Sequence, residues 1–169
     1  MDTVTSLAWT RNRRHIPRAQ WMVTMVNIIE GVTQFNTEHT EVPLTGTRYR
    51  QTLHSLIAWR TIFAELGLIG QDPMRYDGAG FGNISARCGP YPGSRGGRPF
   101  LISGTQTGGS ACLTSDSFAL VERYRFRENA VTSRGMVRPS SESLTHGAIY
   151  DLGAHVRSVV HVHAPALWA

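Results

Sequence analysis

The chain has 169 residues, 41% of them hydrophobic, and a formal net charge of +5. This length and composition predict one globular domain with a sizeable core. Every basic residue is an arginine, which excludes Schiff-base catalysis and P-loop phosphate binding, because both need a lysine amine. The arginines are scattered along the sequence, a distribution that favours anionic small ligands over nucleic acid.

The apolar segments and the cysteines indicate where in the cell the protein is expected. No segment reaches the roughly 18 apolar residues of a membrane span, so no membrane partner is expected. Residues 21–29 follow several arginines but lack a small-x-small cleavage site, and a buried strand is the better interpretation than a leader peptide. Cys88 and Cys112 are too far apart for a CxxC motif. We expect both to be reduced thiols of a cytoplasmic protein.

The first third of the chain is divided at about residue 50. Residues 1–50 are predicted to be an N-terminal extension, loosely held over 1–20, with a possible strand over 21–35 and a polar connection over 37–47. Apolar residues then recur at intervals of three and four over 52–66, which predicts a helix that ends at a glycine. Residues 51–169 are expected to form the main domain.

Further elements follow from local pattern. Apolar spacing at Phe118, Leu120 and Val121 predicts a short helix over residues 116–124, capped by Ser115 or Asp116. The other predicted elements are strands over 83–87, 100–103 and 159–163, a surface loop over 88–99, a strand and turn over 125–135, and a helix over 142–152.

Two glycine-rich segments precede or follow predicted strands. Residues 77–85 read DGAGFGNIS, and residues 103–109 read SGTQTGG. Glycine lets backbone N–H groups approach an anion closely, which would suit phosphate. The alternatives are a turn that needs a positive φ in the first segment and a hydroxyl-capped turn in the second.

Two hydroxyls and a carboxylate begin the last predicted helix. Ser140 and Ser141 would bind phosphate well at a helix N-terminus. Glu142 is a candidate acid or base, and its structural alternative is a carboxylate placed in the first turn to complement the helix dipole.

Two histidines lie two residues apart in an apolar run near the C-terminus. On a strand, His161 and His163 would point to the same face. Two imidazoles that converge with a carboxylate, here Glu142, form a ligand set that Zn²⁺ prefers. The alternative is a pair of histidines satisfied within the core.

Four motifs in order, GFGNIS, LISGTQTGG, PSSESLTHGAIY and VVHVHAPALW, resemble the class II aldolase/adducin family, which includes fuculose-phosphate aldolase, ribulose-phosphate 4-epimerase and methylthioribulose-phosphate dehydratase. The resemblance covers about residue 52 to the end. It implies an α/β fold with three layers, α/β/α, around a largely antiparallel central sheet. It also implies a homotetramer with sites at subunit boundaries.

The resemblance implies a role for each motif. One Zn²⁺ per subunit would be held by His161 and His163, and Glu142 would act as acid/base and also touch the metal. The pocket for the phosphate of a sugar phosphate would comprise Gly82, Asn83, Thr107, Gly108, Ser140 and Ser141.

This sequence departs from the family in two places. Its second loop, SGTQTGG, replaces the shorter threonine-proline form of the sugar aldolases, which weakens the assignment of Thr107. The family's third zinc-binding histidine would lie beyond Ala169, so we expect the C-terminal part of the domain to be missing. His146, one turn after Glu142, is a possible substitute ligand.

The expected function is that of a zinc-dependent lyase of carbohydrate metabolism. It would act on a sugar phosphate or related hydroxy-carbonyl compound through a metal-stabilised enediolate. Aldol cleavage, epimerisation and dehydration share such an anion, so the residues do not choose among them, and truncation would argue against activity of this chain by itself. The alternative is a non-catalytic, adducin-like interaction module.

Overall fold

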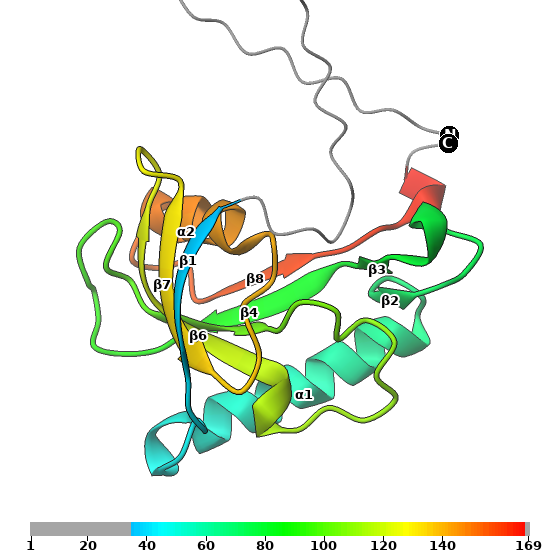
Figure 1. The fold of residues 1–169 in the computed structure, drawn as a ribbon, viewed down its shortest axis with the longest axis horizontal. Coiled ribbons are helices and arrows are strands. Elements are labelled where there is room, and N and C mark those ends of the chain that lie inside the picture. The colour runs from blue at the N-terminus through cyan, green and yellow to red at the C-terminus, as the bar shows by residue number, and fades with distance from the viewer. Residues whose placement is uncertain (1–34, 168–169) are drawn as a thin grey trace, which may run out of the picture.

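The computed structural model describes residues 35–167. A six-stranded sheet in the order β1-β7-β6-β5-β4-β8 forms its centre (Figure 1). Four of its five strand pairings are antiparallel, and β1 runs parallel to β7. The expected α/β class with a largely antiparallel sheet is therefore confirmed. Its strands are β1 Asn36–Glu41, β4 Asn83–Arg87, β5 Phe100–Ser103, β6 Phe118–Arg125, β7 Ala130–Gly135 and β8 Ser158–His161. A separate two-stranded ribbon pairs β2, Gly70–Gln71, with β3, Gly80–Phe81.

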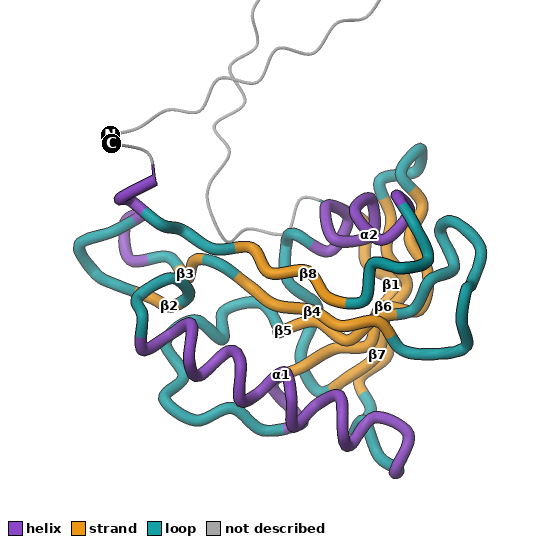
Figure 2. Tube along the Cα trace, turned by 180° about the vertical axis from the view of Figure 1, so that it is seen from behind, coloured by secondary structure: helices purple, strands orange, loops and turns teal. Residues whose placement is uncertain are grey.

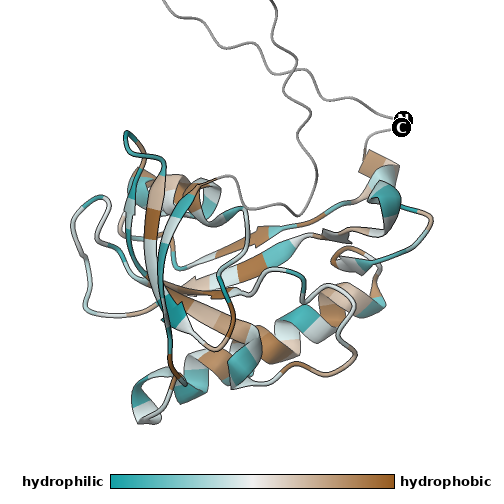
Figure 3. Ribbon diagram, in the orientation of Figure 1, coloured by the Kyte–Doolittle hydropathy of each residue, from teal (hydrophilic) through white to brown (hydrophobic). Residues whose placement is uncertain are grey.

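Two helices cover the sheet, α1 Thr47–Glu65 and α2 Ser143–Leu152 (Figures 1 and 2). Strand β5 shows how they are separated. Leu101 packs in the apolar cluster that includes α1, whereas its neighbour Phe100 packs in the cluster that includes Tyr150 of α2. Successive strand residues point to opposite faces, so each helix packs on its own face. In Figure 3, α1 alternates between hydrophobic and hydrophilic residues, as a helix with one face on the core should.

Strand β1 corrects the prediction of a polar connection over residues 37–47. Its sequence, NTEHTE, contains no large apolar residue, so no hydrophobic alternation marks it as a strand. Backbone pairing with β7 holds it instead, in register from Asn36 opposite Ala130 to Glu41 opposite Gly135. An edge strand of this kind depends on a partner that is distant in sequence, and local pattern does not reveal it.

Strand β6 corrects the prediction of a helix over residues 116–124. A 3₁₀ turn over Ser115–Ser117 is capped by Thr114, rather than by Ser115 or Asp116. The strand Phe118–Arg125 follows, and its first four residues are all buried. A strand that is covered on both faces carries a continuous apolar run, and such a run does not distinguish strand from helix by periodicity.

Several other elements confirm the predictions. The helix expected over 52–66 is α1, which begins earlier, at Thr47, and is followed by Gly67 at φ +67°. The strands predicted over 83–87 and 100–103 are β4 and β5. The loop predicted over 88–99 joins them.

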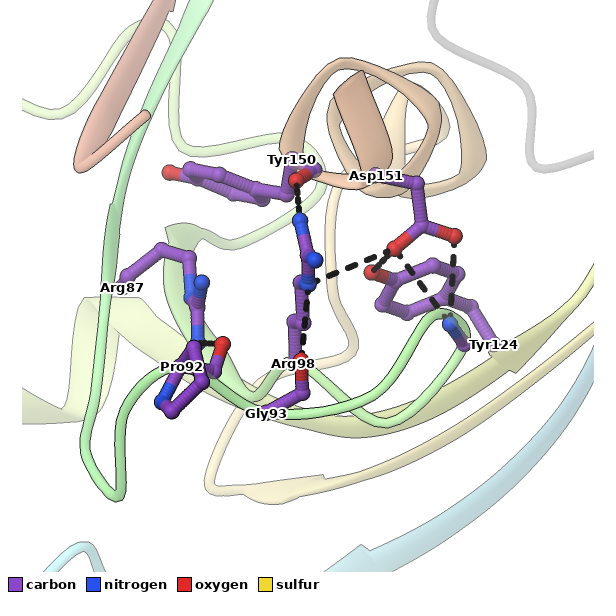
Figure 4. Close-up of polar contacts among 8 residues, drawn as sticks. Arg87, Pro92, Gly93, Arg98, Tyr124, Tyr150 and Asp151 are labelled. Carbon is purple, nitrogen blue, oxygen red and sulfur yellow. Dashed lines mark hydrogen bonds and ion pairs between the residues drawn. The ribbon is translucent and has the colours of Figure 1, made fainter. Parts of the chain in front are cut away.

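Asp151, at the end of α2, fastens the loop between β4 and β5 to the sheet (Figure 4). The Gly96 N–H donates to this carboxylate at 3.1 Å, and the Tyr124 hydroxyl donates to it at 2.8 Å. The Arg98 Nε lies 3.9 Å from the same carboxylate. Arg98 also donates to the carbonyl of Gly93 at 3.1 Å. The loop is therefore tied to the body of the domain by a charge-assisted network.

Three further points complete the description. Within residues 35–167, neither helix is long and apolar enough to cross a membrane. Cys88 is buried, Cys112 is exposed, and both are free thiols. The predictions for residues 1–20 and, except for Phe35, for the strand over 21–35 lie outside the described residues.

Candidate functional site

A cavity of about 430 Å³ lies between the β2–β3 ribbon, the loop after β5 and the start of α2. Its wall contains every residue that the sequence suggested for substrate binding, together with the candidate acid/base. These are Gly82, Asn83, Thr107, Gly108, Ser140, Ser141 and Glu142. The two histidines, His161 and His163, are not part of the wall.

Backbone pairing brings the second loop and the start of α2 together. Gly104 forms an isolated antiparallel bridge with Pro139. The Ser140 N–H donates to the carbonyl of Ser103 at 3.2 Å, and the Thr105 N–H donates to the carbonyl of Arg138 at 2.9 Å. Residues 103–109 and 138–142 are distant in sequence, and these bonds place them on the same wall.

Gly82 makes the sharp turn between β3 and β4. Its φ is +70°, and a Cβ there would lie 2.9 Å from the His161 carbonyl oxygen and 2.9 Å from Ile69 Cγ1. A side chain fits neither this conformation nor this space. The prediction of a positive-φ turn in the first glycine-rich segment is therefore confirmed at Gly82, and the turn delivers Asn83 to the cavity.

Glu142 occupies the N-cap position of α2 and makes no capping bond through its side chain. The helix predicted over 142–152 therefore begins one residue later, at Ser143, and Glu142 precedes its first turn rather than lying in it. Ser140 accepts a hydrogen bond from the Glu142 N–H at 3.3 Å, and Ser143 donates to the Ser140 carbonyl at 2.7 Å. This arrangement places Glu142 on the cavity wall.

His161 and His163 lie beside the cavity, at the end of β8. Their ring centroids are 4.8 Å apart, so the two rings lie side by side, although the strand predicted over 159–163 ends at His161 and His163 follows it. The backbone N–H of His163 donates to the carbonyl of Leu68 at 2.9 Å. Burial lowers the pKa of His163, with smaller contributions in the same direction from His161 and Arg75, whereas Glu142 opposes them. Glu142 is thus electrostatically coupled to His163.

Asn83 links the histidine pair to the cavity. It pairs with His161 across β4 and β8, and its Nδ2 lies 3.4 Å from His161 Nδ1. Asn83 is 6% exposed. Its Oδ1 is buried and has no hydrogen-bond partner among residues 35–167. A buried acceptor without a donor is costly, and a bound ligand with a hydroxyl would satisfy it.

The histidine pair fits part of a zinc site. Two adjacent imidazoles can supply two of the four ligands of a tetrahedral ion. Across the described part of the chain, no group of three or more His, Cys, Asp and Glu side chains is arranged to hold a metal. The pair is thus half of a ligand set, with the remaining positions open to water, substrate or a further ligand.

His146 lies in the core on the other side of β4 from α1. It is fully buried, and its Nδ1 is 2.6 Å from Ser85 Oγ, which also lies 2.7 Å from the Tyr150 hydroxyl. Burial lowers the pKa of His146 to about 3. These contacts make His146 a neutral core histidine, and the described residues do not group it with His161 and His163 as a set of three ligands.

Arg60 also lines the cavity, and no motif suggested it. It lies on α1, and its Nη2 donates to the carbonyls of Thr107 at 3.0 Å and Gly108 at 2.7 Å. A signal was present in the sequence: Leu53, Leu56 and Arg60 fall at the spacing of one helix face. An arginine within an apolar stripe is buried with that stripe and needs a polar partner.

The profile of the class II aldolase and adducin N-terminal domain matches residues 73–169, more than half of the chain. The chain belongs to the class II aldolase and adducin family. The match contains all the motif residues on the cavity wall and both histidines, whereas Arg60 precedes it. In searches of curated proteins and of solved structures, nothing matched. The family includes aldolases, epimerases and dehydratases, so membership does not by itself select a reaction.

Proposed function

We propose that this chain is a zinc-dependent lyase domain of the class II aldolase type, acting on a sugar phosphate or a related hydroxy-carbonyl compound. The observation that carries the proposal is the single cavity that collects residues of all three loop motifs and Glu142. The proposal includes the three-layer architecture, the homotetramer and the cytoplasmic location of such enzymes.

Phosphate binding is assigned to the loops. Ser140 and Ser141 offer hydroxyls beside the N-terminus of α2, and Thr107 and Gly108 lie on the opposite loop. Helix N-termini and glycine-rich loops favour anions because their N–H groups lack intrahelical partners. The Asn83 Oδ1, which lacks a hydrogen-bond partner in the described chain, is suited to accept a hydrogen bond from a substrate hydroxyl.

His161 and His163 are assigned as the metal ligands of this chain. Their adjacent rings supply two nitrogen donors, the type that Zn²⁺ prefers. When bound there, zinc would act as a Lewis acid and stabilise negative charge on substrate oxygens.

Glu142 is assigned as the base. In the direction of bond formation, its carboxylate would take the proton from the carbon next to the donor carbonyl, leaving the electron pair delocalised onto the carbonyl oxygen; in cleavage, the carbon–carbon bond would break and leave its electron pair in the same delocalised anion. Its place on the wall of the phosphate-binding cavity and its coupling to His163 support this role. The same carboxylate, once protonated, would return the proton to the product.

Hydrogen–deuterium exchange tests the proposal without choosing among cleavage, epimerisation and dehydration. The zinc-supplemented chain is incubated in D₂O with a panel of ketose phosphates, and loss of the proton next to the carbonyl is followed by ¹H NMR. We expect exchange with the wild type and none with Glu142→Gln. A control variant, Glu65→Gln, changes an exposed glutamate at the end of α1 and should exchange like the wild type.

A non-catalytic, adducin-like role is the second candidate. It is favoured by the lack of a three-ligand group among residues 35–167. Under that role, no ketose phosphate would exchange its proton at any zinc concentration, and the wild type and Glu142→Gln would be indistinguishable.

A further inference from the structure

Arg60 is a buried positive charge in the wall of the cavity. Its side chain projects from α1, and the residue is only 5% exposed. Desolvation lowers its pKa, yet a guanidinium stays protonated in proteins. A full charge is therefore held in a partly desolvated position at the site proposed above for substrate.

No carboxylate in the described chain forms an ion pair with Arg60. The ion pairs formed by residues 35–167 involve Arg98, Arg125 and Arg134, and none involves Arg60. The two hydrogen bonds that Arg60 makes there, to the carbonyls of Thr107 and Gly108, both use Nη2. Its Nη1 and Nε make no hydrogen bond to the described residues and are not among the fully buried atoms without a partner, so they remain accessible at the cavity. A buried cation with only neutral acceptors is unfavourable unless an anion joins it.

Other buried arginines are compensated or covered. Arg98 lies beside the Asp151 carboxylate (Figure 4). Arg87 also forms no ion pair, and its Nε and Nη1 lack hydrogen-bond partners among residues 35–167, but the Tyr91 ring lies 4.9 Å from its guanidinium carbon and its Nη2 donates to the Pro92 carbonyl. Arg60 has neither a carboxylate nor an aromatic ring as a partner in the described chain, and it borders a cavity large enough for a small ligand. The site of its missing counter-charge is therefore the cavity.

The rest of the wall specifies what kind of anion fits. Among the lining residues Arg60 is the only basic one and Glu142 the only acidic one. On the same wall, the buried Asn83 Oδ1 accepts no hydrogen bond from the described residues. A ligand that satisfies both groups carries an anionic group for the guanidinium and a hydroxyl for the amide oxygen. Arginine matches tetrahedral oxyanions well because its donors form a planar fork.

We propose that Arg60 is a specificity-determining residue that binds the anionic group of the ligand, and that its hydrogen bonds to the carbonyls of Thr107 and Gly108 hold that group against the second loop. The proposal rests on the proposed function only for the location of the site. It adds a charge from α1 to a pocket that the motifs alone would build from hydroxyls and backbone N–H groups.

The test measures binding of inorganic phosphate to the metal-free, full chain by isothermal titration calorimetry. Arg60→Gln removes the charge and should weaken phosphate binding by about ten- to a hundredfold. Arg50→Gln removes an exposed arginine from the same helix and should bind like the wild type. Arg60→Lys keeps a charge without the fork and should fall between the wild type and Arg60→Gln. Circular dichroism of each variant verifies that it is folded.

Two results would overturn the proposal: a wild type that does not bind phosphate, or a folded Arg60→Gln that binds it as tightly as the wild type. If Arg60→Gln does not fold, a structure of the wild type with phosphate decides. Phosphate oxygen within about 4 Å of the guanidinium supports the role, and phosphate placed elsewhere refutes it. Because metal-free protein is used, the two proposals can fail separately. Phosphate binding through Arg60 can hold even if no proton exchange is found, and proton exchange can be found even if Arg60 does not bind phosphate.

Discussion

Replacement of Gly82 by alanine tests how tightly the turn at the cavity is built. The residue has φ +70°, and an added Cβ would lie 2.9 Å from the His161 carbonyl oxygen and 3.1 Å from the Leu68 carbonyl oxygen. The left-handed conformation alone costs a non-glycine residue about 1–2 kcal/mol. Relief of the backbone contacts adds about 1–3 kcal/mol, the usual range for overpacking. We therefore expect Gly82→Ala to lose about 3 kcal/mol of unfolding free energy in total.

Gly67→Ala is the matched control. Gly67 also has a positive φ, +67°, but nothing lies within 4 Å of a Cβ built there. It should lose only the conformational part, about 1 kcal/mol. Equilibrium urea unfolding, followed by circular dichroism, measures both variants. Equal losses in the two variants would refute the argument from close approach, and full stability of Gly82→Ala would refute the positive-φ turn altogether.

Three further predictions concern the core and the cysteines. Cys112 should react rapidly with a thiol reagent at neutral pH, whereas Cys88, whose pKa burial raises to about 11, should react only on unfolding; equal rates would contradict this. Burial lowers the pKa of His146 to about 3, below the value of about 6.5 in the unfolded chain. The free energy of unfolding should therefore fall as the pH drops below about 6.5, by about 2 kcal/mol at pH 5. His146→Gln should flatten this pH profile, measured by urea unfolding. Tyr124→Phe removes the 2.8 Å hydrogen bond to the Asp151 carboxylate and should lower the free energy of unfolding by about 1.5–3 kcal/mol. Thermal unfolding measures this, and an unchanged midpoint temperature would show that this bond does not fasten the loop.

The cavity could be anticipated from the sequence because its parts are marked by local chemistry. A glycine at a positive-φ turn, hydroxyls after a strand and a carboxylate before a helix each have a local physical reason. Their convergence, however, depends on pairings such as Gly104 with Pro139, which join distant segments. The family resemblance, rather than periodicity, predicted that these segments meet.

The missed features have a common cause, which is that they depend on tertiary context. Strand β1 is polar and is recognised only by its pairing with β7. Strand β6 is buried on both faces, so its apolar run resembled a helix face. Arg60 lies in the apolar stripe of α1, and its hydrogen bonds to the carbonyls of Thr107 and Gly108 join segments that are distant in sequence.

Zinc binding by the histidine pair is the central claim, and its direct measurement is the zinc content and affinity of the purified chain by atomic emission and chelator competition. We expect one zinc ion per subunit in the wild type, loss of binding in His161→Ala and His163→Ala, and unchanged binding in His54→Ala, which alters an exposed histidine on α1. A wild type without zinc affinity, or histidine-pair variants that bind like the wild type, would contradict the account.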